Sequence, residues 1–231
     1  MLRSGQGSVK TQAGETGQEL LETVQNRAAN RCRVAVLVSG GGTNLQAVLD
    51  AARAGGIPHG EIALVVSSRP GVKALERAAA FGVEAVVLER SRYETAEKFD
   101  AALLRLLKKH GIELVVLAGF LCILGKKVVK AYPNRMLNVH PSLIPSFCGE
   151  GMYGLKVHEA ALARGVKVTG ATVHYVNEVC DGGEILLQKA VEVRAGDTPE
   201  MLQQRVMERA EWLLLPRAVE IVAARIAAGR G

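Results

Sequence analysis

An amide and an imidazole occupy positions 138 and 140, just before a proline-containing segment. Because side chains alternate along a strand, Asn138 and His140 would point to the same side. Pro141 and Pro145 oppose regular pairing and helix beyond them, so the pair would stand at the carboxyl end of a strand. There an imidazole can move a proton near neutral pH, and an amide can donate to an oxyanion. The alternative is a strand end whose side chains only satisfy the backbone.

A glycine-rich loop is the second feature that could do chemistry. Residues 39–44 include three consecutive glycines. Without Cβ atoms, their N–H groups can approach an anion, and a following helix would add its positive end. Gly41, Gly42, Thr43 and Asn44 are therefore candidates for binding a phosphate. The spacing matches neither a dinucleotide fingerprint nor a P-loop, which favours a phosphomonoester. A tight turn without a ligand is the alternative.

Alternating strand and helix patterns predict the scaffold that positions these residues. The predicted strands are 33–38, 62–66, 85–88, 112–118 and the strand before Asn138, and the predicted helices are 45–53, 72–81, 94–110 and a short one ending at 132. This order predicts one α/β domain with a doubly wound, mostly parallel sheet. The first, fourth and fifth strands would then end at one edge, which brings the glycine loop, the 119–124 turn and His140 together.

The C-terminal part predicts an antiparallel edge. After a helix at 157–164, two β-rich runs cover 168–176 and 185–193. The loop between them holds Asp181, which is followed by two glycines. We expect Asp181 to pair with His140, because a carboxylate stabilises an imidazolium; a turn aspartate is the alternative.

Other residues are assigned supporting or structural positions. Thr172 and His174 lie in the first of these runs and are expected to support the site from behind. His158 is expected to lie on a solvated helix face. Thr198 would begin a final long helix, in which Pro216 is expected to produce a kink. No His-Glu-x-x-His or comparable spacing occurs, so no metal is expected.

Composition narrows the class of protein. The chain has 231 residues, is 48% hydrophobic and carries a net charge of +6. Aromatic content of only 4% and short basic runs argue against a nucleic-acid partner. Four scattered cysteines predict neither disulfides nor structural zinc. Without a signal-peptide core or an apolar run of about 20 residues, a cytoplasmic protein with no membrane partner is expected. Residues 1–31 would be an N-terminal extension, flexible or a short helix, outside a domain at 32–231.

Several ordered motifs resemble the phosphoribosylglycinamide formyltransferase family. They are SGGGTNLQ at 39–46, LAGF at 117–120, NVHPSLIP at 138–145, GATVH at 170–174 and DGG at 181–183. The resemblance covers about residues 33–225. It implies a formyltransferase-like fold and a monomer or homodimer. It also implies transfer of a formyl group from 10-formyltetrahydrofolate, a co-substrate, to the amine of glycinamide ribonucleotide in purine biosynthesis.

The resemblance also implies roles for individual residues. Asn138, His140 and Asp181 would be the catalytic trio, the glycine loop would hold the nucleotide's phosphate, and Glu211 would bind near the ribose. The residues implied to border the folate are Leu121, Cys122, Ile123, Leu124, Asn177, Glu178, Val179 and Cys180. Neither a covalent intermediate nor a metal is needed. Ile144–Pro145 would be a cis peptide.

One departure from the family concerns the folate side. Many relatives carry an arginine where this chain has Cys122, which cannot make a two-pronged contact with a carboxylate. Arg92 or Lys98 is expected to supply the missing cation.

Related activities are the competing interpretations. A formyltetrahydrofolate hydrolase would be expected to carry a regulatory domain before the first strand, and only about 30 residues precede it here. A methionyl-tRNA formyltransferase would be expected to carry a C-terminal RNA-binding domain. A non-catalytic nucleotide-binding protein would keep the glycine loop but would need neither His140 nor Asp181.

Overall fold

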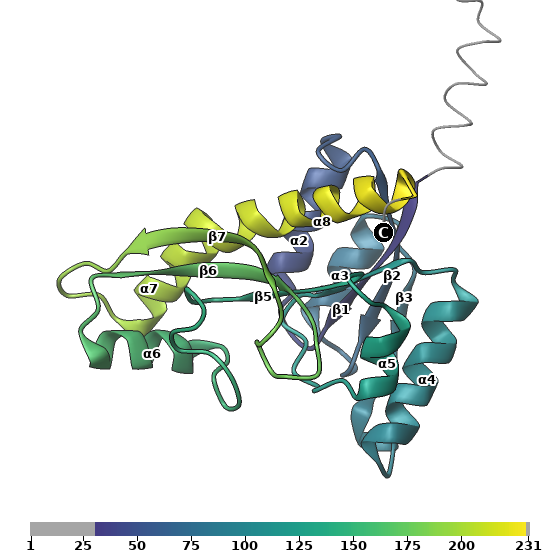
Figure 1. Ribbon diagram of the computed structural model, residues 1–231, viewed down its shortest axis with the longest axis horizontal. Coiled ribbons are helices and arrows are strands. Elements are labelled where there is room, and N and C mark those ends of the chain that lie inside the picture. The colour runs from purple at the N-terminus through teal and green to yellow at the C-terminus, as the bar shows by residue number, and fades with distance from the viewer. Residues whose placement is uncertain (1–30, 230–231) are drawn as a thin grey trace, which may run out of the picture. The chain divides into compact units, whose positions relative to one another are not determined.

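Seven strands form one sheet within residues 31–229, the part of the chain that the computed structural model describes (Figure 1). Its order is β3-β2-β1-β4-β5-β6-β7. The strands are β1 (Cys32–Val38), β2 (Gly60–Ser67), β3 (Ala85–Val87), β4 (Leu114–Leu117), β5 (Met136–His140), β6 (Val168–Tyr175) and β7 (Ile185–Glu192). Neighbouring strands from β3 to β5 are parallel to each other. Strand β6 is antiparallel to β5, and β7 is antiparallel to β6. The predicted mostly parallel, doubly wound sheet with an antiparallel C-terminal edge is confirmed.

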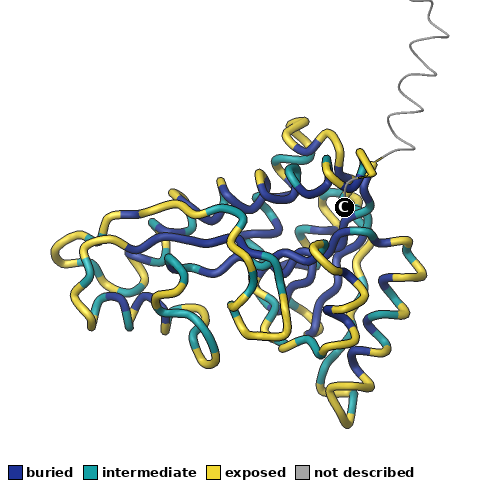
Figure 2. Tube along the Cα trace, in the orientation of Figure 1, coloured by how far each residue is buried: buried dark blue, intermediate teal, exposed yellow. Residues whose placement is uncertain are grey.

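Helices cover both faces of this sheet. They are α2 (Thr43–Arg53), α3 (Lys73–Ala80), α4 (Ala96–Lys109), α5 (Lys126–Ala131), α6 (Leu155–Arg164), α7 (Pro199–Val206) and α8 (Trp212–Ala227). The apolar run of β1 requires cover on both sides, because its side chains alternate between two cores. Val34, Val36 and Val38 face α2, α3 and α8, whereas Ala35 and Leu37 face α4 and α5. In Figure 2 the central strands are dark blue and the connecting loops are mostly teal or yellow.

The final helix differs from its prediction in one place. The hydroxyl of Thr198 caps α7 by accepting from the Met201 amide at 3.3 Å, as expected of the residue that begins it. The irregularity, however, is a π turn at Met207–Glu211, and α8 runs through Pro216. The carbonyl that Pro216 would disturb, four residues before it, belongs to Trp212, the residue directly after the π turn.

The predicted N-terminal extension lies outside the described residues, apart from Arg31. In residues 31–229 no helix is long and apolar enough to cross a membrane.

The prediction for His158 is wrong, because α6 packs this side chain inward. His158 is fully buried, and neither of its ring nitrogens has a hydrogen-bond partner among the described residues. Burial, followed by the nearby charge of His140, lowers the pKa of His158 from 6.5 to about 4. The neighbouring positions Val157 and Ala161 are buried as well, so this face of α6 belongs to the core.

His158 predicts how stability depends on pH. Between pH 6.5 and about 4 the unfolded chain binds a proton at this residue that the folded protein does not. The folded state should therefore lose up to about 3 kcal/mol as the pH falls through this range. His158→Phe should lose less, which urea unfolding at pH 7 and pH 4.5 measures. The exposed-residue control His59→Gln should behave as wild type. An equal loss in His158→Phe would contradict the prediction.

Candidate active site

The carboxyl ends of β1, β4 and β5 meet at one edge of the sheet. Leu37 pairs with Leu117, and Leu117 pairs with Asn138, so the three strands end in register. The hydroxyl of Ser39 lies 2.7 Å from that of Ser68 and accepts from the Leu121 amide at 2.9 Å. These bonds join the loops after β1, β2 and β4 on the side where β5 ends.

The structure brings Asn138, His140 and Asp181 together. Asn138 and His140 lie on β5, and Asp181 reaches them from the loop between β6 and β7. Asp181 Oδ2 lies 3.4 Å from His140 Nδ1, and Oδ1 accepts from Asn138 Nδ2 at 3.3 Å. The side chains of His140 and Asp181 are only 5% and 8% exposed, so their charges are poorly screened by water.

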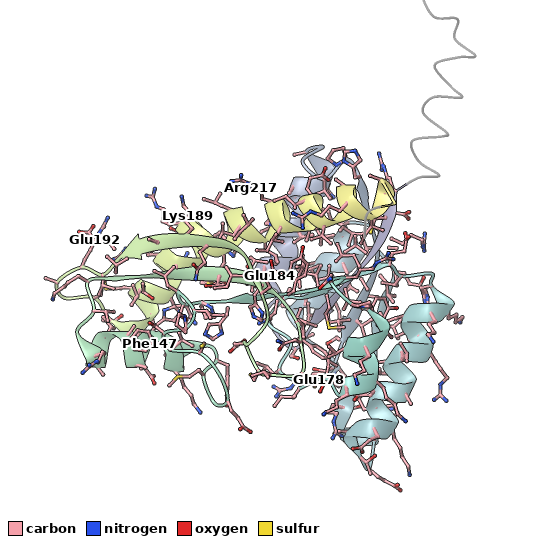
Figure 3. All side chains as sticks on the ribbon, in the orientation of Figure 1. Phe147, Glu178, Glu184, Lys189, Glu192 and Arg217 are labelled. Atoms are coloured by element: carbon pink, nitrogen blue, oxygen red, sulfur yellow. The ribbon has the colours of Figure 1, made fainter. Side chains whose placement is uncertain are left out.

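Both ring nitrogens of His140 face oxygen atoms. Nδ1 faces the Asp181 carboxylate, and Nε2 lies 2.8 Å from the carbonyl oxygen of Phe147. Figure 3 labels Phe147, which lies on the loop between β5 and α6. Two facing acceptors suit the protonated ring, because only the imidazolium carries N–H donors at both nitrogens.

Asp181 is stabilised as a carboxylate. Burial by itself raises the pKa of Asp181, but the neighbouring His174 imidazole, the hydrogen bond from the Gly149 amide and the His140 imidazole bring it below its usual value. The Gly149 amide donates to Oδ2 at 2.9 Å. Asp181 also has φ 53, a left-handed conformation that is uncommon outside glycine. Partners from three segments therefore hold a side chain whose backbone is strained.

His174 and Thr172 lie directly across the strand pair from Asn138 and His140. His174 Nδ1 lies 2.8 Å from the Tyr175 carbonyl, so it carries the proton and Nε2 is free to accept from Asn138 Nδ2 at 3.2 Å. Both N–H groups of Asn138 are thus turned toward His174 and Asp181. The Asn138 carbonyl oxygen accepts no hydrogen bond from the described residues. A role of this amide as a donor to an oxyanion stays a prediction.

Thr172 supports the turn that follows His140. Its hydroxyl donates to the Ser142 carbonyl at 2.7 Å and accepts from the Ile144 amide at 3.1 Å. The Ile144–Pro145 peptide is cis, as expected.

The glycine loop leads directly into α2, and Gly42 is its N-cap. Gly42 has φ 71, and a Cβ there would lie 2.7 Å from the Ala74 Cβ, so no other residue fits. A Cβ at Gly41 would meet nothing within 4 Å. Thr43 and Asn44 form the first turn of the helix rather than part of the loop, which directs their amides toward the same side. Arg77 adds a cation behind the loop, where its Nε donates to the Gly41 carbonyl at 2.9 Å.

Glu211, near the C-terminal helix, contacts the candidate phosphate site at the start of α2. It ends the π turn, is buried, and its Oε2 accepts from Asn44 Nδ2 at 2.6 Å. Burial raises the pKa of Glu211, and the hydrogen bond from Asn44 opposes this shift. The structure thus brings Glu211 to the start of α2.

The residues proposed to border a folate lie on two loops of the same edge. Leu121, Ile123 and Val179 are 51%, 70% and 65% exposed. Figure 3 labels Glu178, whose carboxylate pairs with Lys126 at 2.9 Å and joins its loop to α5. The remaining members of the set are Cys122, Leu124, Asn177 and Cys180, and the side chain of Asn177 closes its own turn through Gly182 and Val179.

Arg92 and Lys98, the cations expected to replace the family's arginine, each have a carboxylate partner nearby. Arg92 pairs with Glu89 at 2.6 Å, and Lys98 pairs with Glu94, so both have local carboxylate partners. A role for either in place of the family's arginine stays a prediction. Burial raises the pKa of the Cys122 thiol, whereas a hydrogen bond with Ser68 and the charges of Arg90 and Arg69 act to lower it. Arg90 and Arg69 are therefore cations close enough to act on Cys122.

Sequence reasoning missed the residues that act through the backbone. Phe147 accepts with its carbonyl and Gly149 donates with its amide, so neither side chain carries a signal. Arg77 could have been found as the basic residue in the helix after β2. Within residues 31–229, no group of three or more His, Cys, Asp or Glu side chains is placed to bind a metal.

Comparison with known proteins agrees with this arrangement. A family model described as formyl transferase matches residues 32–219. The chain is 43% identical over 194 residues to the trifunctional purine biosynthetic protein adenosine-3 of Gallus gallus. It is 38% identical over 195 residues to the chloroplastic phosphoribosylglycinamide formyltransferase of Arabidopsis thaliana. The chain belongs to the formyl transferase family.

These matches cover 84% of this formyl transferase but only 19% and 65% of the two relatives. A solved structure, glycinamide ribonucleotide transformylase 1 from Symbiobacterium toebii, has a TM-score of 0.79 at 44% identity. That match covers 84% of this chain and 89% of the other.

Glu211 should lower the stability of this formyl transferase as the pH rises. The unfolded carboxyl loses its proton first, because the pKa of Glu211 is raised in the folded state. Glu211→Gln keeps an oxygen for Asn44 but does not titrate. Its stability relative to wild type should therefore increase from pH 5 to pH 8, as measured by urea unfolding. The exposed neighbour Glu208→Gln is the control, and a constant difference for Glu211→Gln would contradict the prediction.

Proposed function

We propose that this formyl transferase transfers the formyl group of 10-formyltetrahydrofolate to the amine of glycinamide ribonucleotide. The observation that carries the proposal is the imidazole of His140, held between the Asp181 carboxylate and the Phe147 carbonyl on the same edge as the glycine loop. The names of the relatives, which include phosphoribosylglycinamide formyltransferase, support the substrate assignment.

The reaction requires one new bond, one broken bond and one proton transfer. The amine nitrogen attacks the formyl carbon, and the carbonyl oxygen takes up negative charge. The bond from that carbon to N10 of the folate then breaks, N10 gains a proton and the amine loses one. An N–H donor aimed at the oxyanion and a group that carries the proton are what the site must supply.

His140 and Asp181 supply both requirements. Nε2–H, which now donates to the Phe147 carbonyl, would instead donate a hydrogen bond to the oxyanion. As the C–N10 bond breaks, this proton would pass to N10, and Nε2 would take up the proton that the amine loses. Asp181 stays ionised because its pKa lies below the usual value, and its carboxylate orients the imidazole ring of His140. Asn138 would accept an N–H of the attacking amine through its free carbonyl oxygen, while His174 fixes the orientation of the amide.

The glycine loop would hold the nucleotide. The amides of Gly41, Gly42 and the first turn of α2 face one side and suit a phosphate at the positive end of the helix. Glu211, fixed by Asn44, would accept from the ribose hydroxyls. The folate would lie against Leu121–Leu124 and residues 177–180, where Leu121, Ile123 and Val179 have exposed apolar side chains.

Other features of the proposal come from the sequence alone. A cytoplasmic location, a monomeric or homodimeric state and the absence of nucleic-acid and membrane partners stay predictions, as does the domain boundary at residue 32. No metal is part of the proposed reaction.

Formyl transfer measured with and without glycinamide ribonucleotide tests the proposal. Wild type should form tetrahydrofolate only when the amine substrate is present, whereas a hydrolase would form it from formyltetrahydrofolate and water. His140→Ala should lower kcat by about 10²–10⁴, the usual contribution of general acid–base catalysis. Nucleotide binding, measured by calorimetry, should change little because the phosphate site is separate. Turnover above about a tenth of wild type would remove His140 from this role.

The two glycine positions give different expected results. Gly41→Ala has space for its methyl group, so its melting temperature should match wild type. That methyl group would keep phosphate from the backbone, so KM for the nucleotide should rise about tenfold and KM for the folate should not.

Gly42→Ala should instead lower the melting temperature, because its Cβ meets Ala74. Steady-state kinetics and thermal unfolding distinguish the two variants. An unchanged nucleotide KM in Gly41→Ala would place the phosphate elsewhere.

A further inference from the structure

Beneath the loop between β4 and α5 lies a buried carboxylate that the proposed reaction does not use. Asp100, in the second turn of α4, is only 5% exposed. Its Oδ2 accepts from the Gly125 amide at 2.8 Å, and its Oδ1 is buried without a partner among the described residues. Burying a carboxylate with one hydrogen bond is unfavourable for folding. A carboxylate at such a position therefore suggests a role for Asp100 other than stabilising the fold.

The loop 119–125 is anchored at three points. The ring of Phe120 stacks on Phe99, the neighbour of Asp100, with centroids 6.5 Å apart and an interplanar angle of 22°. The Leu121 amide donates to Ser39 at 2.9 Å, and the Gly125 amide donates to Asp100. Asp100 is therefore the anchor at the C-terminal end of the loop.

The close contact with Asp100 requires a residue without a Cβ at position 125. A Cβ at residue 125 would overlap with Asp100 Oδ2, so only glycine allows the backbone to approach the carboxylate this closely. Leu121 is at the first backbone anchor and Ile123 lies between the two, and their side chains are 51% and 70% exposed. The anchors thus hold apolar side chains in solvent at the ligand edge, where hydrophobic collapse alone would not place them.

We propose that Asp100 is a positioning residue that fixes the loop 119–125 against the folate and thereby sets the affinity for the formyl donor. The inference rests on the proposed function. Asp100 does not touch the reacting atoms, and it acts through the Gly125 amide.

Kinetics of Asp100→Ala, Asp100→Asn and Leu107→Ala test the inference. Asp100→Ala removes the acceptor, so KM for 10-formyltetrahydrofolate should rise about tenfold, whereas KM for the nucleotide and kcat should stay within about twofold. Asp100→Asn keeps an oxygen for Gly125 and should recover most of the folate affinity. Leu107→Ala creates a cavity at the other end of the same helix. It should lower the melting temperature without changing either KM.

Gly125→Ala provides a second route that keeps Asp100. Its methyl group should displace the carboxylate and raise the folate KM as Asp100→Ala does. In the double variant the methyl group has space, so the two effects should not add. This variant tests the inference even if Asp100→Ala does not fold.

Two results would overturn the inference. One is an equal rise of both KM values in Asp100→Ala, and the other is a folate KM in Leu107→Ala that rises as much as in Asp100→Ala. A wild-type protein that transfers no formyl group to glycinamide ribonucleotide would instead reject the proposed function. In that case folate affinity of the same variants, measured by calorimetry with tetrahydrofolate, decides on Asp100.

Discussion

The buried charge of Asp181 is the constraint on which the site depends. A carboxylate so far from water needs compensating donors, and it has them only because three segments converge. β5 contributes Asn138 and His140, the loop before α6 contributes the Gly149 amide, and His174 on β6 orients Asn138 and lies 3.5 Å from the carboxylate. The antiparallel turn from β6 to β7 carries Asp181 back over the end of β5. The change from parallel to antiparallel pairing at β5 is therefore what assembles the site.

The parallel part of the sheet brings the candidate ligand-binding groups to the same edge by a different route. Parallel strands end together, so the start of α2 and the loop after β4 lie on the edge where β5 ends at His140. Glu211 arrives from the other end of the chain, on a π turn that points its carboxyl at Asn44. A buried acid with a raised pKa at that position is unfavourable for folding, which is the usual cost of a pre-formed binding group.

Local sequence signals were enough to predict the sheet with its helices and to identify side chains of unusual type as site candidates. The apolar run of β1, the three glycines before α2 and the Asn-x-His pair each identify their own element, because the pattern reflects local geometry. His158 could not be placed this way. The helical period marks which residues share a face, but the packing of that face decides whether an imidazole is buried. Phe147 and Gly149 act through backbone atoms, which every residue has.

The same loop carbonyl both orients His140 and competes with the proposed reaction. While Phe147 accepts from Nε2, that proton is held in place and the ring is kept in one orientation. An oxyanion would need the same N–H, because the other nitrogen faces Asp181. Gly149, Gly151 and Gly154 in this loop all have positive φ. Glycine has no Cβ and can change between positive and negative φ at little steric cost. For the proposed transfer, the loop must therefore yield the N–H to the substrate while Asp181 keeps the ring in place.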